Sequence, residues 1–401
     1  MSDLALSVPR RAAARLPRRA APALLLYAAV RLLGIATLAL WSDRPAKDVR
    51  TLLSERWDSL WYVRVVEHGY DFTLTAPDGR VLSDMAFFPL LPWLESALSA
   101  VTPLSPADAG LVVSAAASLL AAAGLYAIGE RLYGARAGIA LAVLWAALPV
   151  GIVQSMAYSE SLFTALAAWS LYAVLSGRWV WAGTLSALAG LTRPVGAAVV
   201  AAIWLTGLAV LWAADERRRG VPVVRRLLAG VAPPPGRGRM LAGMALAPLG
   251  WLGFLLWVGA ETGDPLGYFE IQAEWGNGFD GGLAFARFVG ARLTDPGPAV
   301  LAGLALGAGV ALLVWVFVLC VRRGQPLPLL TYAAAVVVLA LGASGFIGSK
   351  PRLLLPAFPL LLPAAQAMAR ARPRTAWCVA GALTVVSAVY GAFWLNGTGP
   401  P

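Results

Sequence analysis

The sequence is poor in charge. Charged residues make up only 13% of the 401 residues, whereas hydrophobic types make up 59%. Soluble domains usually carry about 25% charged residues. The few charges also cluster between long apolar runs, so the chain cannot fold as a soluble globular domain and is expected to lie in a membrane.

Metal-ligating side chains are also scarce. The chain has one histidine, His68, and two cysteines, Cys320 and Cys378, which form no CxxC pair. A histidine-based metal cluster, a zinc site and a disulfide framework are therefore not expected. Asp58 and Asp84 could bridge a divalent cation, but two carboxylates are too few to predict a site. No cofactor is predicted.

The apolar runs are long enough to cross a hydrocarbon core about 30 Å thick, and they lack the alternation of barrel strands. Backbone in lipid must pair its own polar groups, so these runs predict helices. They lie near 22–41, 108–128, 137–153, 157–176, 179–192, 194–213, 240–260, 297–321, 327–347, 352–369 and 375–395. The prediction is an all-α, polytopic transmembrane bundle of about eleven helices, formed by one domain over residues 1–401. The apolar stretch 86–101 contains Pro89, Pro92 and Glu95 and is expected to be re-entrant or interfacial; if it crosses, the count is twelve.

Basic residues are distributed unevenly along the chain, whose net charge is +11. With a cytoplasmic N-terminus, the cytoplasmic segments hold 20 Lys/Arg and 4 Asp/Glu, while the outer segments hold 11 and 17. This is a strong positive-inside pattern. It places 1–21 and the linker 214–239 in the cytoplasm, and the long loops 42–107 and 261–296 outside. Because topology accounts for the basic residues, nucleic acid is not an expected partner.

The first apolar run, 22–41, is longer than the core of a signal peptide and has no clear cleavage site, so we expect a retained signal anchor. The abundance of Ala, Arg, Gly and Pro suggests a GC-rich bacterial genome. The expected location is a bacterial plasma membrane, or the ER membrane if the chain is eukaryotic.

The first long loop contains Glu55-Arg56-Trp57-Asp58-Ser59-Leu60-Trp61-Tyr62. If 55–67 is helical, Asp58, Trp61 and Tyr62 share one face. A carboxylate beside two aromatic rings suits a sugar site, because the rings can stack on CH groups and the acid can accept a hydroxyl proton. The alternative is an interfacial helix whose Trp57, Trp61 and Tyr62 anchor it at the bilayer surface.

Two further acids stand at the starts of apolar segments. Asp84 precedes the proline-containing stretch Phe87-Phe88-Pro89, where it could also be a helix cap. Glu160, in Tyr158-Ser159-Glu160-Ser161, could equally be a first-turn acid. The second long loop gives a weaker signal, with Gln272, Glu274 and Trp275.

Three cations could bind an anion. Arg193 lies between two apolar segments, at a membrane depth where arginine is costly unless it is paired or hydrated. Lys350 and Arg352 fall on the outer side, against the positive-inside trend. Such a pair can hold a lipid phosphate, and the guanidinium fork suits it. The alternatives are snorkelling for Arg193 and simple headgroup contact for the other two.

The order of these motifs resembles that of the PIG-V mannosyltransferase family. The shared motifs are Arg56-Trp57-Asp58, Gly69-Tyr70, Phe87-Phe88-Pro89-Leu90-Leu91-Pro92 and Tyr158-Ser159-Glu160-Ser161. That family makes the second mannose transfer of glycosylphosphatidylinositol (GPI-anchor) synthesis in eukaryotes, has bacterial relatives and belongs to the GT-C superfamily of glycosyltransferases. Leu191-Thr192-Arg193-Pro194, and Arg352 with Phe358-Pro359, also look like GT-C features.

The resemblance implies an inverting sugar transfer, with mannose as the sugar and a polyprenyl phosphate as the donor, on the outer face. Asp58 matches the family's catalytic acid of the first outer loop. The expected substrate-binding residues are Arg56, Trp57, Trp61, Tyr62, Asp84, Phe88, Tyr158, Glu160, Arg193, Lys350 and Arg352. The chain is short for the eukaryotic enzyme, and bacteria lack its pathway. The acceptor, whether lipid-linked, glycan or protein, therefore stays open.

Two other functions compete with this interpretation. A transporter or lipid flippase would carry intramembrane charges paired across internal repeats, and the sequence has no such repeat. A non-catalytic membrane scaffold gives no reason for Asp58, Arg193 and Arg352 to meet in one cavity. The tertiary arrangement of these three residues therefore discriminates between the functions.

Overall fold

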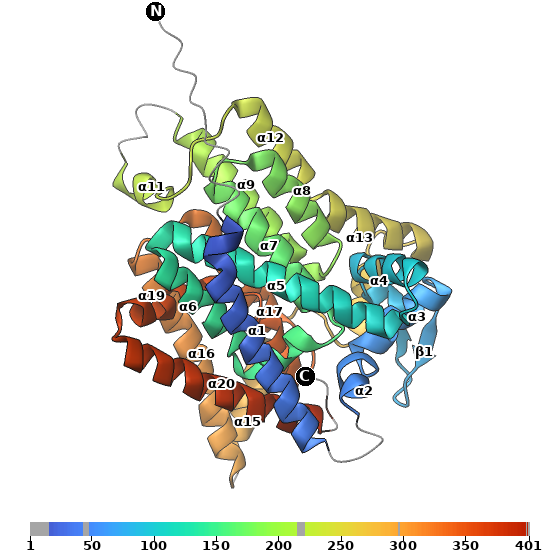
Figure 1. Ribbon diagram of the computed structural model, residues 1–401. Coiled ribbons are helices and arrows are strands. Elements are labelled where there is room, and N and C mark those ends of the chain that lie inside the picture. The colour runs from blue at the N-terminus through green and yellow to red at the C-terminus, as the bar shows by residue number, and fades with distance from the viewer. Residues whose placement is uncertain (1–15, 43–47, 215–220, 296, 398, 400–401) are drawn as a thin grey trace, which may run out of the picture.

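The computed structural model describes residues 16–42, 48–214, 221–295, 297–397 and 399, and it is almost entirely helical (Figure 1). Among these residues the only sheet is a small hairpin of β1 (Thr73–Thr75) and β2 (Val81–Ser83), with Thr73 opposite Ser83. The all-α prediction is confirmed.

Six helical segments of the described chain are long and apolar enough to cross a membrane. Each is 19–28 residues long, as a hydrocarbon core requires. They are α1 (Leu16–Trp41), α5 (Pro106–Tyr133), η5 with α9 (Pro194–Gly196 and Ala197–Trp212), α12 with α13 (Arg237–Leu246 and Leu249–Thr262), α16 (Ala299–Arg322) and α20 (Pro373–Leu395).

Two further segments are sharply bent, which the sequence analysis did not anticipate. The first joins α6 (Ala135–Ala146) to η4 (Pro149–Ser155) at 87°. The second joins η6 and α18 (Ile347–Ser349 and Lys350–Leu353) to η7 and α19 (Phe358–Leu361 and Leu362–Arg370) at 73°. Prolines stand at both breaks, because a proline cannot continue the hydrogen-bond ladder of the preceding helix.

The remaining membrane helices are short: α7 (Ser159–Leu175), α8 (Trp179–Gly190) and α17 (Leu327–Gly342). Counting by length and composition therefore gives six spans, or eight with the bent pairs, and the count of eleven is not confirmed. The short helix α7 is buried along most of its length. A helix enclosed by protein does not need the hydrophobic length that lipid contact demands.

The ambiguous stretch 86–101 forms α4 (Leu90–Val101). Its 12 residues span only about 18 Å at 1.5 Å per residue, too little to cross a bilayer. The helix packs between α3 (Asp58–His68) and α5. This agrees with an interfacial helix in the first long loop.

The two long loops are folded and contact each other. The first contains α2 (Val49–Ser54), α3, the hairpin, η3 (Asp84–Ala86) and α4, which gather beside the start of α5 (Figure 1). The second contains α14 (Gly267–Glu274) and α15 (Leu283–Thr294). The backbone N–H of Val81 donates to the Glu274 carboxylate at 3.1 Å, and the Trp275 indole donates to the Ser83 carbonyl at 3.0 Å. We call this end of the bundle the loop end.

The opposite end carries α11 (Pro222–Leu227) and is called the linker end. Arg19, near the start of α1, lies 3.8 Å from Glu130, near the end of α5. Arg131 donates to the carbonyls of Leu175, which ends α7, and Gly230. Segments that the charge pattern assigns to one side of the membrane therefore lie together in space.

Glycines allow close approach of the helices on the α8 side of the bundle. A Cβ added to Gly183 of α8 would lie 2.1 Å from the Gly243 carbonyl oxygen of α12. One added to Gly250 of α13 would lie 1.9 Å from the Ala187 carbonyl oxygen. Small residues let membrane helices pack backbone to backbone, which fixes α8 and the residues that follow it at the loop end.

Candidate active site

A cavity of about 430 Å³ opens at the loop end of the bundle. Residues from both long loops and from the ends of several membrane helices line it. They include the charged residues Asp58, Glu160, Arg193 and Arg352, the polar or aromatic residues Tyr62, Phe87, Phe88, Tyr268, Gln272, Trp275, Asn277 and Ser349, and the apolar residues Val336, Leu339, Ala340, Leu353 and Pro356.

Asp58 is the first residue of α3, and its position is set by the two residues before it. Trp57 has φ +53°, and among the described residues it is the one non-glycine with a positive φ. Such a conformation is strained for a bulky residue and persists only where neighbouring contacts enforce it. Arg56 supplies one such contact, because its guanidinium donates to the carbonyls of Leu395 and Gly397 at 2.8 and 3.2 Å. The Asp58 backbone N–H donates to the Tyr158 hydroxyl at 3.3 Å.

Four charged side chains form a continuous chain of ion pairs across the cavity. Nη1 of Arg352 lies 2.8 Å from Oδ2 of Asp58, and its Nε lies 3.3 Å from Oε1 of Glu160. Nη1 of Arg193 lies 2.6 Å from the same Glu160 oxygen. The Glu160 side chain is only 1% exposed, and a carboxylate buried so deeply requires cationic partners.

These ion pairs leave hydrogen-bonding capacity unused. Within the described part of the chain, Nε and Nη1 of Arg352 have no acceptor in hydrogen-bond geometry, and neither Glu160 oxygen has a donor. Buried polar atoms normally find hydrogen-bond partners, and each exception calls for a physical reason. A bound anion with several oxygen atoms could accept from the Arg352 nitrogens, whose ion-pair contacts to Asp58 and Glu160 lack hydrogen-bond geometry.

Hydrogen bonds and aromatic contacts hold the wall beside Asp58. The hydroxyls of Tyr62 and Ser159 are 2.8 Å apart, and Ser159 also accepts from Nη1 of Arg193 at 3.1 Å. The Phe87 ring meets the Tyr62 ring edge to face at 5.3 Å. Trp275 packs against Phe87 from the second loop, with ring centroids 5.3 Å apart. The cavity wall is therefore rigid and rich in aromatic faces.

Several predicted residues lie just behind this wall. Trp61 stacks on Phe87 at 5.6 Å and meets Trp275 at 4.8 Å, but it does not line the cavity. The buried Tyr158 ring lies 5.1 Å from the Arg352 guanidinium. Trp61 and Tyr158, like Arg56 and Trp57, therefore border the site rather than face it.

Asp84 and Lys350 point elsewhere. The buried Asp84 carboxylate accepts from the Phe72 backbone N–H at 3.1 Å at the base of the hairpin, and desolvation by burial raises its pKa. Asp84 does not line the cavity that contains Asp58. The Lys350 ammonium donates to the carbonyls of Ala340 and Ala343 at 3.0 and 2.7 Å, where it caps the C-terminus of α17.

The second loop contributes polar residues that the sequence analysis ranked low or did not single out. Gln272 donates to the Ala86 carbonyl at 3.1 Å and to the Tyr268 hydroxyl at 2.8 Å. Asn277 donates to Gln272 at 3.2 Å. The only sequence signal was that polar and aromatic residues occur in a long loop, which is typical of functional loops but does not link them to Asp58.

Asp58, Arg193 and Arg352 thus meet in one cavity at the loop end. They come from α3, from the residue before η5 and from α18. Of the other predicted residues, Tyr62, Phe88 and Glu160 line the same cavity. A non-catalytic scaffold gives no reason for this convergence.

Comparisons with known proteins place the fold. A protein-family model described as "Dolichyl-phosphate-mannose-protein mannosyltransferase" matches residues 86–230. No curated protein matches the chain. The chain is similar to ArnT from Cupriavidus metallidurans bound to undecaprenyl phosphate, with a TM-score of 0.52 and 16% identity over 89% of this chain and 61% of ArnT. The apo state of ArnT gives a TM-score of 0.51 with the same identity and coverage. The oligosaccharyltransferase AglB from Archaeoglobus fulgidus gives 0.47, with 15% identity over 94% of this chain and 56% of AglB.

The likeness to ArnT shows that this bundle has a GT-C-like membrane fold, as predicted. The family match covers the segment from η3 and α4 to the linker, which includes Glu160 and Arg193 of the cavity. The chain spans about three-fifths of the length of ArnT. Fold and family match together support the GT-C superfamily of membrane glycosyltransferases.

Proposed function

We propose that this protein is an integral membrane glycosyltransferase that moves a sugar from a polyprenyl-phosphate donor to an acceptor hydroxyl on the extracytoplasmic face. The observation that carries the proposal is the ion-pair chain Asp58–Arg352–Glu160–Arg193 in a cavity at the loop end. It brings a carboxylate that can accept a proton next to cations that can hold a phosphate.

Arg352 is the proposed ligand of the donor phosphate. Arg352 is only 8% exposed, and its Nε and Nη1 have no acceptor in hydrogen-bond geometry among the described residues. A guanidinium fork matches two phosphate oxygens, and its fixed charge stabilises negative charge as the phosphate departs. Arg193 pairs with Glu160 at 2.6 Å and so neutralises a carboxylate that would otherwise offset the charge of Arg352. The ArnT structure bound to undecaprenyl phosphate supports a lipid of this class as donor.

The apolar side of the cavity suits the polyprenyl tail. Val336, Leu339 and Ala340 of α17 line it together with Leu353 and Pro356. Because α17 is an apolar helix of the membrane bundle, a tail lying along it would pass from the cavity into the hydrocarbon core. Phosphate and tail would therefore bind at opposite sides of one cavity.

Asp58 is the proposed general base. Its carboxylate takes the proton of the acceptor hydroxyl while that oxygen attacks the anomeric carbon from the face opposite the phosphate. The bond between the anomeric carbon and the phosphate oxygen breaks, and the phosphate leaves with the electron pair. The product has inverted anomeric configuration, and the proton resides on Asp58 until solvent removes it. A positioned base contributes about 10²–10⁴-fold to such a rate.

Mannose is the proposed sugar. The order of motifs that resembles the PIG-V family supports it, as does the family description that names a dolichyl-phosphate-mannose enzyme. The aromatic wall of Phe87 and Trp275 offers faces on which sugar CH groups can stack. The acceptor is proposed to be lipid-linked, glycan or protein, in a bacterial plasma membrane.

A transfer assay tests the function. Membranes containing the protein are incubated with radiolabelled polyprenyl-phosphate mannose, and labelled glycolipid and glycoprotein are separated. Extracts of a deletion strain serve as the source of unglycosylated acceptor. We expect label transfer that is lost in Asp58→Asn. If no polyprenyl-phosphate sugar served as donor and the protein instead moved the lipid between leaflets, the protein would be a flippase and not a glycosyltransferase.

A further inference from the structure

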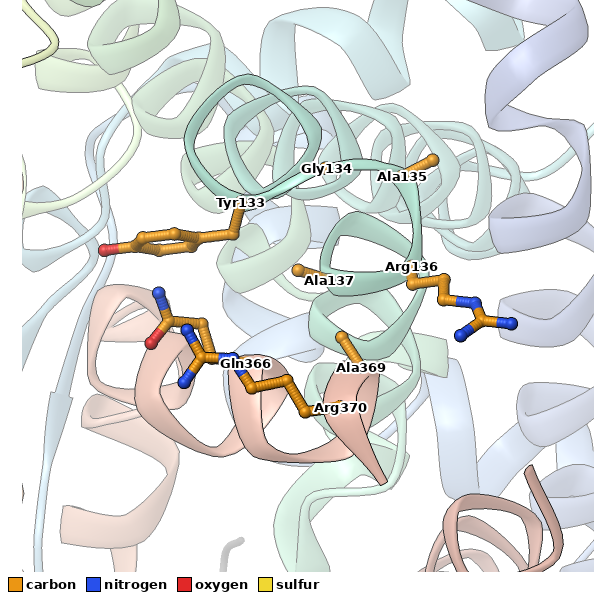
Figure 2. Close-up of a pocket in the computed structure, with 8 residues that line it drawn as sticks. All are labelled: Tyr133, Gly134, Ala135, Arg136, Ala137, Gln366, Ala369 and Arg370. Carbon is orange, nitrogen blue, oxygen red and sulfur yellow. The ribbon is translucent and has the colours of Figure 1, made fainter. Parts of the chain in front are cut away.

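A second cavity, also about 430 Å³, lies at the linker end of the bundle, away from the candidate active site. It is formed by the turn that joins α5 to α6 and by the last turns of α19 (Figure 2). The residues that line it are Tyr133, Gly134, Ala135, Arg136, Ala137, Gln366, Ala369 and Arg370.

Cations border this cavity without carboxylate partners. Figure 2 shows the Arg370 side chain beside Gln366 and below the Tyr133 ring, while the Arg136 side chain extends from the start of α6 in the opposite direction, away from these three side chains. In the described part of the chain, neither arginine forms an ion pair. A third cation is close, because Nη1 of Arg323 donates to the Gln366 side-chain oxygen at 3.0 Å.

Anionic side chains are rare around the cavity. Among the described residues of the linker end, the one carboxylate is Glu130. It already accepts from the Tyr126 hydroxyl at 3.0 Å and lies 3.8 Å from Arg19. The free charge of Arg136 and Arg370 is therefore not neutralised by the protein.

The cavity is not simply a polar site. Ala135, Ala137 and Ala369 form much of its lining, together with the Tyr133 ring. It lies where α5 and α19 end and α6 begins, near the basic linker, since Arg131 beside it donates to the Gly230 carbonyl. A free phosphate ion would gain nothing from these apolar walls, whereas a phospholipid presents a phosphate and an adjoining apolar chain. By the positive-inside pattern this boundary faces the cytoplasmic leaflet, whose anionic lipids attract basic pockets between helices.

We propose that this cavity binds the headgroup phosphate of an anionic phospholipid, with Arg370 as its cationic ligand. The Gln366 side-chain nitrogen and the Tyr133 hydroxyl face the same space and can donate to phosphate oxygens (Figure 2). The acyl chains then leave along the alanine-lined wall. This site is independent of the proposed transferase activity, because it shares no residue with the cavity at the loop end.

Lipid titration of the purified full-length protein tests the proposal. Native mass spectrometry measures binding of phosphatidylglycerol and of phosphatidylcholine with identical acyl chains, and glycerol phosphate without acyl chains is the third probe. We expect phosphatidylglycerol to bind best and to raise the melting temperature, since a ligand of the folded state stabilises it. Each arginine near an anionic phosphate contributes about fivefold in affinity. Arg370→Gln should therefore weaken phosphatidylglycerol binding about fivefold.

A matched control is Arg178→Gln, which removes one exposed cation outside the cavity lining. This variant should bind phosphatidylglycerol as the native protein does. Equal binding of the two lipids, or equal loss in Arg370→Gln and Arg178→Gln, would overturn the proposal in favour of general surface charge. Binding of glycerol phosphate as tight as that of the lipid would overturn it in favour of a soluble anion.

Discussion

Nη1 of Arg352, from the C-terminal part of the chain, lies 2.8 Å from Oδ2 of Asp58 in the first long loop. The same guanidinium reaches Glu160 of α7 with its Nε at 3.3 Å. Arg352 therefore ties the loop that carries the proposed base to the membrane bundle. Binding of a donor phosphate to this arginine would place the anomeric carbon in the same cavity as Asp58.

The first prediction concerns Asp58. Asp58→Asn keeps the size of the side chain and removes its charge, so turnover should fall about 10²–10⁴-fold in the labelled-sugar transfer assay. Glu67→Gln is the matched control, because Glu67 lies on the same helix with half of its side chain exposed. Glu67→Gln should leave the turnover nearly unchanged. If Asp84→Asn abolished transfer while Asp58→Asn did not, Asp84 would be the base.

The second prediction concerns the phosphate site. Arg352→Ala should lower kcat/KM for the donor, because one buried charge contact to the phosphate is lost. The fall should correspond to about 2–4 kcal/mol of lost transition-state stabilisation. Arg352→Lys should recover only part of the activity, since the bidentate geometry is lost. Melting temperatures of both variants must accompany the kinetics, because removal of Arg352 also leaves Asp58 and Glu160 less neutralised. Kinetics of Arg352→Ala equal to those of the native protein would exclude the assignment.

The third prediction separates Lys350 from Arg352. The Lys350 ammonium caps the end of α17 and does not line the cavity. Lys350→Met should therefore lower the melting temperature and change the donor KM much less than Arg352→Ala does. A loss of donor affinity as large as that of Arg352→Ala, at unchanged stability, would instead show that Lys350 binds the phosphate directly.

The fourth prediction concerns pH and Glu95 of α4. Glu95 is 1% exposed, one of its carboxylate oxygens has no partner among the described residues, and desolvation raises its pKa to about 8. The folded state therefore holds a proton that the unfolded state releases near pH 4.5. Stability should fall by up to about 1.4 kcal/mol per pH unit as pH rises from about 4.5 to 8.

Glu95→Gln should remove this pH dependence, because a neutral amide of similar shape has no proton to release. Thermal unfolding in detergent between about pH 5 and about pH 9 measures the effect. The variant should be more stable than the native protein at the alkaline end. Parallel pH profiles for the two proteins would mean that Glu95 does not titrate in this range.

The fifth prediction is the orientation of the bundle. A cysteine placed at Arg237, in a protein from which Cys320 and Cys378 have been removed, should be labelled only after the membrane is made permeable. A cysteine at Glu270 of the second loop should be labelled from outside. Labelling of position 237 from outside would reverse the topology and place the candidate active site in the cytoplasm.

The sequence alone determined that the protein is an all-α membrane bundle with two long loops. Apolar runs with so few charges have no other stable conformation in lipid, because the backbone must satisfy its own hydrogen bonds. It also singled out Arg193 and Arg352, since charges at membrane depth or against the positive-inside trend are costly without a role. It singled out Asp58 by its aromatic neighbours and Glu160 by its place at the start of an apolar segment.

Only the tertiary structure decided how these residues combine. The pairing of Arg352 with Asp58 and Glu160, and the cap that Lys350 forms on α17, depend on which helix ends meet. Hydrophobic periodicity specifies which face of a helix is apolar but not which helix it packs against. For the same reason the sequence could not place Gln272 and Asn277 in the cavity, or the bend between α6 and η4. Those features arise from contacts between residues far apart in the chain, which close packing of the bundle brings together.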